Sequence, residues 1–394
     1  MVHLSSALLF AGTALSLPAA EIFERQGTCS VPSSIAAVNY AKLPDPFTFE
    51  GGKKVATKDD FDCRSQEIFK AFQQYELGDY PGPPDSVKGT LSGTTLTVQV
   101  TAGGKSVSFT ASIRKPSGSG PFPAIIGIGG VSIPVPSNVA QITFNNDDFA
   151  SQASGSSRGQ GKFYTLFGAS HSAGALTAWA WGVDRLVDAL EQVNATSGID
   201  TTRLGVSGCS RNGKGAFIVG ALVKRIALTI PQESGSGGAA CWRISDQQHN
   251  AGKNIQTAGE ITGENVWFST RLNSYNTKTS TMPEDHHMLA ALVVPRGLLV
   301  IENDIDWLGP VATTGCMKAG RLIYKAYGVP VNMGFSLVGG HSHCQFPSSQ
   351  NTVLTQYINY FLLKSGTAPP ETEQSSATVD MSSWTGDWTV PTLT

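Results

Sequence analysis

Ser210 lies in a segment that is typical of a catalytic nucleophile. Residues 204–215 read LGVSGCSRNGKG and lead into the apolar run AFIVGAL, which predicts a strand, a glycine-flanked turn and a helix in succession. Such a turn exposes a serine at the edge of a sheet, and the N-terminus of the helix behind it favours developing negative charge. The motif is not a strict G-x-S-x-G, because Asn212 occupies the last glycine position and Gly213 comes one later. On this segment alone, an ordinary strand-to-helix loop is the alternative.

A nucleophilic serine needs a general base and an acid that orients the base, usually in the chain order Ser, acid, His. Glu233 closely follows the apolar run at 226–230, and two histidines follow the last run, at 333–338. The run at 297–301 is followed by rival acids, namely Glu302, Asp304 and Asp306. The carboxyl ends of parallel strands build the sites of open α/β sheets. The residues therefore predict a serine hydrolase site there, with the choice of acid left open.

Two cysteines stand next to the candidate catalytic residues. Cys209 precedes Ser210, and Cys344 follows His343. If the serine and the base come within hydrogen-bonding reach, their neighbours approach disulfide distance as well. The sequence thus predicts a Cys209–Cys344 disulfide, which favours His343 over His341 as the base.

The N-terminus reads as a secretory signal peptide over residues 1–20, with a possible pro-segment to about residue 26. The apolar run at 7–17 is too short to span a bilayer, and small residues follow it at once. A buried N-terminal helix is the alternative. The mature protein is expected to be soluble and extracellular, which makes the single sequon at Asn194 a candidate glycosylation site.

All six cysteines follow the signal, so three disulfides are expected in an oxidising compartment. With the first pair assigned, three pairings of the other four cysteines are possible. The local choice is Cys29–Cys63, which leaves Cys241–Cys316.

Composition and periodicity predict one α/β domain over residues 27–364. The chain has 394 residues, is 40% hydrophobic and has a net charge of −2, so it can bury a core and has no strong field for nucleic acid or anionic membranes. A hairpin is expected within 85–116, followed by buried strands that alternate with helices at about 176–190 and 352–363. This alternation predicts a mostly parallel sheet with helices on both faces. Residues 365–394 are rich in Ser, Thr and Pro and are expected to form an appended tail.

Other chemical candidates are weaker. His341 and His343 could bind a metal, but no acidic or cysteine cluster joins them at ligand spacing, so neither a metal nor a cofactor is expected. The His286–His287 pair follows two acids and is expected in a solvated loop. The segment SHSAG at 170–174 resembles an elbow, but no strand precedes it, and it is expected to cap the next helix. Arg211 and Lys214 lie close after Ser210 and could contact an anionic or acyl oxygen.

Three motifs together resemble the fungal glucuronoyl esterases: GCSRNG at 208–213, PQESG at 231–235 and GHSHCQFP at 340–347. The resemblance extends from about Cys29 to Leu363. It implies an α/β-hydrolase fold, with helices on both faces of the sheet, and a secreted, monomeric enzyme without a cofactor. Its expected substrate is the ester between 4-O-methylated glucuronic acid of xylan and alcohols of lignin, with no nucleic-acid or membrane partner.

The resemblance also assigns roles to individual residues. It makes Ser210 the nucleophile, His343 the base and Glu233 the acid. It also implies that the Arg211 side chain stabilises the oxyanion. The positions that would hold the sugar are Lys214, Gln256, Glu264 and Trp307. All three disulfides named above match the family pattern. One departure is Ser342, where relatives often have Asn; it puts none of these roles in doubt.

Two other functions fit parts of this pattern. Another secreted carbohydrate esterase, such as an acetyl xylan esterase, would use the same triad. A non-catalytic carbohydrate-binding protein would keep the sugar-contacting residues and need no triad.

Overall fold

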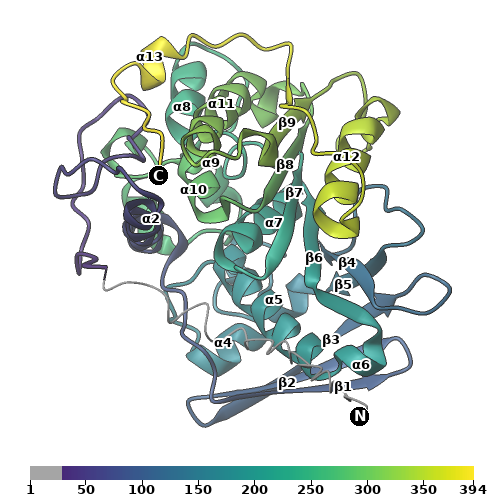
Figure 1. Cartoon of the computed structure of the whole chain (residues 1–394). Coiled ribbons are helices and arrows are strands. Elements are labelled where there is room, and N and C mark those ends of the chain that lie inside the picture. The colour runs from purple at the N-terminus through teal and green to yellow at the C-terminus, as the bar shows by residue number, and fades with distance from the viewer. Residues whose placement is uncertain (1–28) are drawn as a thin grey trace, which may run out of the picture.

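Short apolar runs form the middle strands of a ten-stranded sheet that crosses the whole molecule (Figure 1). The computed structural model describes residues 29–394. The sheet has the order β1-β2-β3-β5-β4-β6-β7-β8-β9-β10; β1, β2, β3 and β5 pair antiparallel, and every pair from β5 to β10 is parallel. The strands are β1 (Ser86–Ser92), β2 (Thr95–Ala102), β3 (Lys105–Arg114), β4 (Phe122–Ile128), β5 (Ala140–Phe144), β6 (Ile199–Cys209), β7 (Ile226–Gln232), β8 (Gly297–Glu302), β9 (Met333–Leu337) and β10 (Glu373–Gln374).

The predicted hairpin is confirmed as β2 and β3, which pair from Thr95–Ser112 to Ala102–Lys105 around a Gly103–Gly104 turn. Strand β5, which the sequence analysis did not predict, lies between β3 and β4 and links the antiparallel edge to the parallel part. Its pattern AQITF is only five residues long, too short for alternation alone to identify it.

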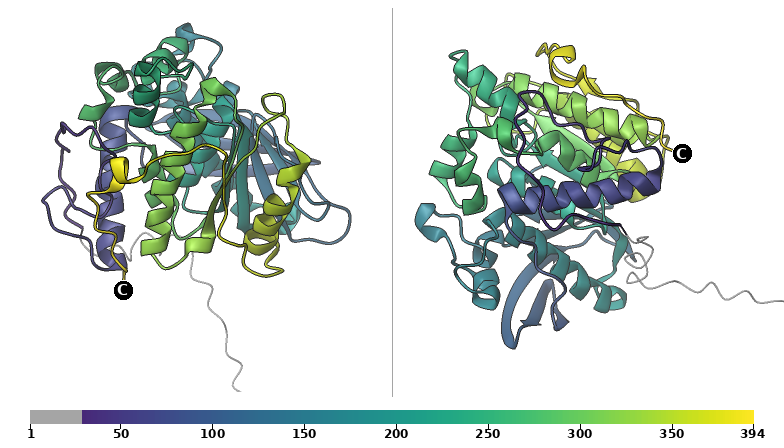
Figure 2. Two further views of the ribbon diagram at one scale, coloured as in Figure 1. Left: turned by 90° about the horizontal axis from the view of Figure 1, so that it is seen from above. Right: turned by 90° about the vertical axis from the view of Figure 1, so that its left-hand side faces the viewer.

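Helices cover both faces of the sheet, unequally (Figures 1 and 2). One face packs against the larger core cluster, with α5, α7, α10 and α11, and α2 lies outside them against α10. The other face packs mainly against α12 and the π-helical turn Asn359–Leu363. Successive side chains of a strand point to opposite faces, so Ile126 belongs to the first cluster and Ile125 to the second. The predicted architecture, a mostly parallel sheet between helices, is confirmed.

The longer helices are α2 (Lys58–Phe72), α5 (Ala175–Gln192), α7 (Arg211–Leu222), α8 (Trp242–Asn250), α11 (Pro310–Ala326) and α12 (Asn351–Ile358). The shorter ones are α3 (Asn146–Phe149), α4 (Lys162–Phe167), α6 (Asn194–Ser197), α9 (Ala258–Glu264), α10 (Leu289–Val293) and α13 (Ser382–Thr385). Among residues 29–394, no helix is both long and apolar enough to cross a membrane.

The segment 365–394 is more than the appendage expected from its composition. Its strand β10 pairs in parallel with β9 and completes the sheet. Trp384 and Leu393 are 7% and 5% exposed and belong to the larger core cluster. Arg321 on α11 forms ion pairs with Glu371 and Glu373. A few separate anchors therefore hold this segment, which explains why it shows no apolar period.

The segment SHSAG at 170–174 does not cap a helix through a side chain, contrary to expectation. Helix α5 begins after Gly174, which makes no side-chain capping bond. The Ser172 hydroxyl instead donates to Asp79 at 2.7 Å and accepts from the Asp79 N–H at 3.0 Å. The segment therefore anchors the loop before α5 to the residues after α2.

The structure contains the three predicted disulfides, Cys29–Cys63, Cys209–Cys344 and Cys241–Cys316, with Cα–Cα distances of 5.3, 5.8 and 5.1 Å.

The signal peptide, the pro-segment and the start of the mature chain lie outside the described residues. Asn194 is exposed at the start of α6, and its glycosylation stays a prediction.

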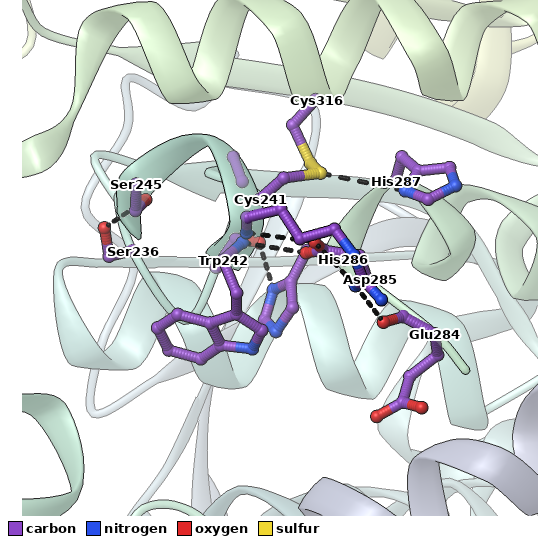
Figure 3. The surroundings of a disulfide bond; sticks show 12 residues. Ser236, Cys241, Trp242, Ser245, Glu284, Asp285, His286, His287 and Cys316 are labelled. Atoms are coloured by element: carbon purple, nitrogen blue, oxygen red, sulfur yellow. Dashed lines mark hydrogen bonds and ion pairs between the residues drawn. A yellow bond between two sulfur atoms is a disulfide. The ribbon is translucent and has the colours of Figure 1, made fainter. Parts of the chain in front are cut away.

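The expectation of a solvated His286–His287 loop is wrong, because both side chains are fully buried beside Cys241–Cys316 (Figure 3). His286 Nε2 lies 2.7 Å from Glu76 Oε1, and its Nδ1 lies 2.6 Å from the Gly238 carbonyl. The two acids that precede this pair, Glu284 and Asp285, are also fully buried. Neither carboxylate oxygen of Glu284 has a hydrogen-bond partner within the described part of the chain. The polar residues around this pair suggested exposure to solvent. The histidines are buried instead, because their hydrogen-bond partners come from segments that lie far away in sequence.

Replacing Glu284 by glutamine is expected to stabilise the protein increasingly as pH rises. Burial, with Glu76 nearby, raises the pKa of Glu284 well above 4.5, so the folded state keeps a proton that the unfolded chain releases. The free energy of unfolding of the parent should fall above about pH 4.5, by up to about 1.4 kcal/mol per pH unit, and Glu284→Gln removes this pH-dependent loss. Denaturant titrations between pH 4 and pH 8 measure the difference. Asp147→Asn, at an exposed carboxylate, is the control, and a variant that tracks the parent at every pH contradicts the prediction.

Candidate active site

Ser210 forms a sharp turn between β6 and α7. Its φ of 61° and ψ of −128° lie outside the usual regions, and its N–H donates to the Gln232 carbonyl at 3.0 Å. The turn requires small neighbours: a Cβ on Gly208 would lie 2.4 Å from the Asn212 carbonyl oxygen, and one on Gly213 would lie 2.4 Å from that of Gln232. The turn therefore has the geometry of a nucleophile elbow, although the sequence lacks the strict G-x-S-x-G motif.

Asn212, which occupies the last glycine position of that motif, is held by neighbouring side chains. Its Oδ1 accepts from Asn146 Nδ2 at 3.1 Å and from Gln152 Nε2 at 3.3 Å. This position thus has room for a polar side chain, with partners that the sequence did not reveal.

Glu233 and His343, the predicted acid and base, lie in contact. Glu233 is fully buried at the end of β7, with φ +44°, and its Oε2 lies 2.8 Å from His343 Nδ1. The same oxygen accepts from the Cys344 N–H at 2.8 Å. Since a carboxylate only accepts, Nδ1 carries the proton and Nε2 has a free lone pair. The imidazole is thus held in the tautomer that a general base requires.

Ser210 and His343 line the same cavity, but no hydrogen bond joins them in the described structure. His343 Nε2 is buried and has no hydrogen-bond partner within residues 29–394. Catalytic hydrogen bonds often form only when substrate is bound. The Trp307 ring lies against the imidazole edge to face, with 4.8 Å between ring centroids, and limits how the imidazole can tilt.

The rival acids have other surroundings. Glu302 is buried, and its Oε1 accepts from the Ser234 N–H at 2.8 Å, the Ser234 hydroxyl at 2.9 Å and the Gly235 N–H at 3.1 Å. It therefore holds the backbone directly after Glu233, and burial raises its pKa to about 7. The remaining rivals, Asp304 and Asp306, are exposed.

The His341 side chain makes its closest contact with the backbone of its own loop. Its Nε2 lies 2.8 Å from the Val338 carbonyl, and its Nδ1 lies 3.8 Å from Glu233 Oε1. In residues 29–394, one group of possible metal ligands was found, Cys209, His343 and Cys344. Its cysteines are joined in a disulfide, so they supply no thiolates. This disulfide ties the turn of the serine to the loop of the histidine, as the adjacent positions in the sequence predict.

The four predicted sugar-contacting residues line one cavity of about 280 Å³ with Ser210 and His343. Gln256 Nε2 donates to Glu264 Oε2 at 3.2 Å, and the Gln256 N–H donates to the Trp307 carbonyl at 3.2 Å. Lys214 is buried and donates to the Ser234 carbonyl. Its burial lowers the pKa of the ammonium group to about 8, against the opposing charges of Glu302 and Glu264. The cavity thus offers hydrogen-bond donors and acceptors beside the serine.

The sequence and the fold both match one family of known enzymes. The sequence model described as "Glucuronyl esterase, fungi" matches residues 98–328. A curated 4-O-methyl-glucuronoyl methylesterase of Neurospora crassa is 70% identical over 396 residues, covering 100% of each chain. That of Thermothelomyces thermophilus is 70% identical over 387 residues, 98% of this chain and 97% of its own. This chain belongs to the fungal glucuronoyl esterases.

The crystal structure of a glucuronoyl esterase from Sporotrichum thermophile has a TM-score of 0.91 to the present chain, at 68% identity, and covers 93% of this chain and 100% of its own. A serine-to-alanine variant from the same organism, in complex with methyl 4-O-methyl-β-D-glucopyranuronate, matches with the same TM-score, identity and coverage. The present esterase therefore has the α/β-hydrolase fold.

Sequence reasoning missed Trp267, which lines the esterase cavity together with the predicted residues. Its indole Nε1 donates to Gln152 Oε1 at 2.7 Å, and Lys214 Nζ lies 5.9 Å from its ring centroid. The only clue in the sequence was that Trp267 lies three residues after Glu264, a predicted sugar-contacting residue.

Sequence reasoning also missed a second, larger cavity of about 470 Å³, lined in part by residues 129–132. That loop follows β4, far from the catalytic motifs in sequence.

Proposed function

We propose that this glucuronoyl esterase hydrolyses the ester between 4-O-methyl-D-glucuronic acid of xylan and alcohols of lignin, with Ser210 as nucleophile. The main support is the buried Glu233–His343 contact of 2.8 Å, beside a turn that exposes a serine. The complex of the Sporotrichum thermophile variant with a methyl glucuronate ester supports glucuronic acid as the acid component of the substrate ester.

The reaction would proceed through an acyl-enzyme. Ser210 Oγ attacks the uronoyl carbonyl carbon while His343 Nε2 takes the hydroxyl proton, and Glu233 stabilises the imidazolium that results. The C–O bond to the alcohol then breaks, and His343 returns the proton to the leaving oxygen. Water, deprotonated by the same nitrogen, attacks the acyl carbon, and the uronic acid is released as Ser210 regains its proton.

The oxyanion would be stabilised at the start of α7. The Arg211 N–H belongs to the first turn of this helix, where backbone donors lack intrahelical partners, and its guanidinium is exposed beside the serine in both cavities. Lys214, Gln256, Glu264 and Trp307 would bind the hydroxyls and ring of the sugar. A nearly neutral set of groups suits this substrate, because an ester carries no charge at the reacting carbon.

Arg211→Ala is expected to lower kcat about a hundredfold or more while the protein stays folded, because the side chain is exposed and a donor to the oxyanion is lost. Hydrolysis of methyl glucuronate and the Tm of both proteins test this. Near-normal turnover would remove the guanidinium from the mechanism.

The test of the proposed function compares methyl glucuronate ester with an acetylated xylo-oligosaccharide as substrates of the parent protein. Faster hydrolysis of the glucuronate ester is expected. A preference for the acetyl ester would assign the chain to the other class of carbohydrate esterase, and absence of both activities would favour the carbohydrate-binding alternative.

Secretion, glycosylation at Asn194 and a monomeric state complete the proposal. The catalytic domain is proposed to begin at about residue 27 and to include the segment 365–394, which adds β10 to the sheet and Trp384 and Leu393 to the core. The support for secretion is the sequence of residues 1–20 and the three disulfides. Mass spectrometry of the protein secreted by a fungal host, before and after treatment with an N-glycosidase, measures the mature N-terminus and the occupancy of Asn194.

A further inference from the structure

The Gln152 side chain joins two parts of the active site that lie far apart in the sequence. It is 4% exposed, in the loop after α3, and it lines neither of the two cavities that contain Ser210. Its Oε1 accepts from the Trp267 indole N–H at 2.7 Å, and its Nε2 donates to Asn212 Oδ1 at 3.3 Å. Trp267 belongs to the wall of both cavities, and Asn212 belongs to the turn of the serine. Gln152 thus links the cavity wall to the nucleophile turn without lining a cavity itself.

The backbone around Gln152 anchors this link. The Gln152 carbonyl accepts from Asn265 Nδ2 at 2.8 Å, and Asn265 directly follows Glu264, a predicted sugar-contacting residue. The loop is fixed to α5, because the Ala150 carbonyl accepts from the buried Trp179 indole N–H at 2.9 Å. One loop residue therefore holds the cavity wall at two points.

The bond to Trp267 is the one that depends on Gln152. Asn212 keeps a second donor, Asn146 Nδ2 at 3.1 Å, whereas the indole N–H has no other acceptor within residues 29–394. Trp267 is 3% exposed, and a buried N–H without an acceptor is unfavourable. Without the amide, the indole would have to turn to regain a partner. Lys214 Nζ lies 5.9 Å from the centroid of this ring, within the range of a cation–π contact, so Lys214 would be disturbed as well.

We propose that Gln152 is a positioning residue of the esterase. By holding the Trp267 indole, it sets the geometry of the wall that binds the sugar, which includes Lys214 and Glu264. It acts on substrate binding rather than on the chemical step, because none of its hydrogen bonds reaches the catalytic triad. The inference rests on the proposed function, since it requires the sugar of a uronate ester in the smaller cavity.

The first test is the variant Gln152→Met, which has a similar unbranched side chain and lacks both the donor and the acceptor. We expect KM for methyl glucuronate to rise about tenfold while kcat stays within about threefold of the parent, because binding to the wall is lost. A merely structural role would reduce the fraction of active protein, and with it the apparent kcat, at an unchanged KM.

Gln74→Met is the matched control. The half-buried Gln74 side chain also uses both of its amide atoms, which bond to the Ile35 N–H at 2.9 Å and to the Ile35 carbonyl at 2.8 Å. Gln74 lines neither cavity. The control should therefore lower Tm and leave KM unchanged.

A double-mutant cycle tests whether Gln152 acts through the indole. Trp267→Phe keeps an aromatic ring and removes the N–H. If the bond between the two residues carries the effect, adding Gln152→Met to Trp267→Phe should raise KM by less than about threefold further, whereas independent effects multiply. Multiplied effects in the double variant, or a KM of Gln152→Met equal to that of the parent, would overturn the inference.

If Gln152→Met does not fold, Gln152→Asn decides the question in the same assay. Its shorter amide cannot reach the indole, so a rise of about tenfold in KM is again expected, and an unchanged KM would overturn the inference. Hydrolysis of methyl glucuronate by the parent tests the proposed function separately. An inactive parent would contradict that function, whereas an active Gln152→Met with the KM of the parent would contradict only the role of Gln152.

Discussion

Ser210→Ala is expected to lower kcat for methyl glucuronate by about 10⁶-fold and to leave the protein folded. The side chain provides the only atom that would bond to the acyl carbon, and the turn depends on the backbone and on the small residues Gly208 and Gly213 rather than on the hydroxyl. Steady-state hydrolysis, together with Tm and circular dichroism, measures both parts of the prediction. Because the acyl-enzyme cannot form, the variant should also show no burst of alcohol release.

Ser172→Ala is the matched control for this variant, since Ser172 is the other serine in an elbow-like sequence. Its hydroxyl bonds to Asp79, so the control should lose some stability and keep its turnover. Activity of Ser210→Ala close to that of the parent would assign the nucleophile elsewhere. We also expect Ser210→Ala to bind the ester as tightly as the parent does, although it does not hydrolyse it.

Glu233→Gln is expected to lower kcat by about a hundredfold or more, because a neutral amide no longer stabilises the imidazolium that forms on His343. The carboxylate oxygen Oε2 accepts from both His343 Nδ1–H and the Cys344 N–H. The amide oxygen of glutamine can take this position and keep both bonds and the tautomer, but it lacks the negative charge of the carboxylate. The pH profile of kcat/KM and the Tm of the variant test this, and a loss of Tm alone would indicate a purely structural role.

Glu302→Gln is the control that distinguishes the two neighbouring acids. Glu302 contacts Ser234 and Gly235 rather than the histidine, so the variant should lose stability and less than about tenfold in kcat. A larger loss of activity from Glu302→Gln than from Glu233→Gln would exchange their roles.

Local patterns predicted most of the elements that position the site. Strands β4, β7 and β8 are apolar runs because both of their faces are covered by helices, and α5 keeps a long helical period. Helix α11 was missed because small residues such as Gly315 and Gly320 pack closely against their neighbours and interrupt the apolar stripe. The buried charges around Glu284 and His286 were misread because their partners lie far away in sequence.

The sequence by itself determined the class of chemistry, because the small residues around Ser210, the chain order of acid and base, and the two adjacent cysteines are local features of a single chain. It could not decide from residue types alone between Glu233 and Glu302, since both are acids that follow apolar strands. The tertiary structure decided which of them faces His343: the turn with φ +44° directs the Glu233 carboxylate to Nδ1, while Glu302 binds the backbone beyond it. Only the tertiary structure could reveal the cavity beside residues 129–132, because an enclosed volume arises where segments distant in sequence meet.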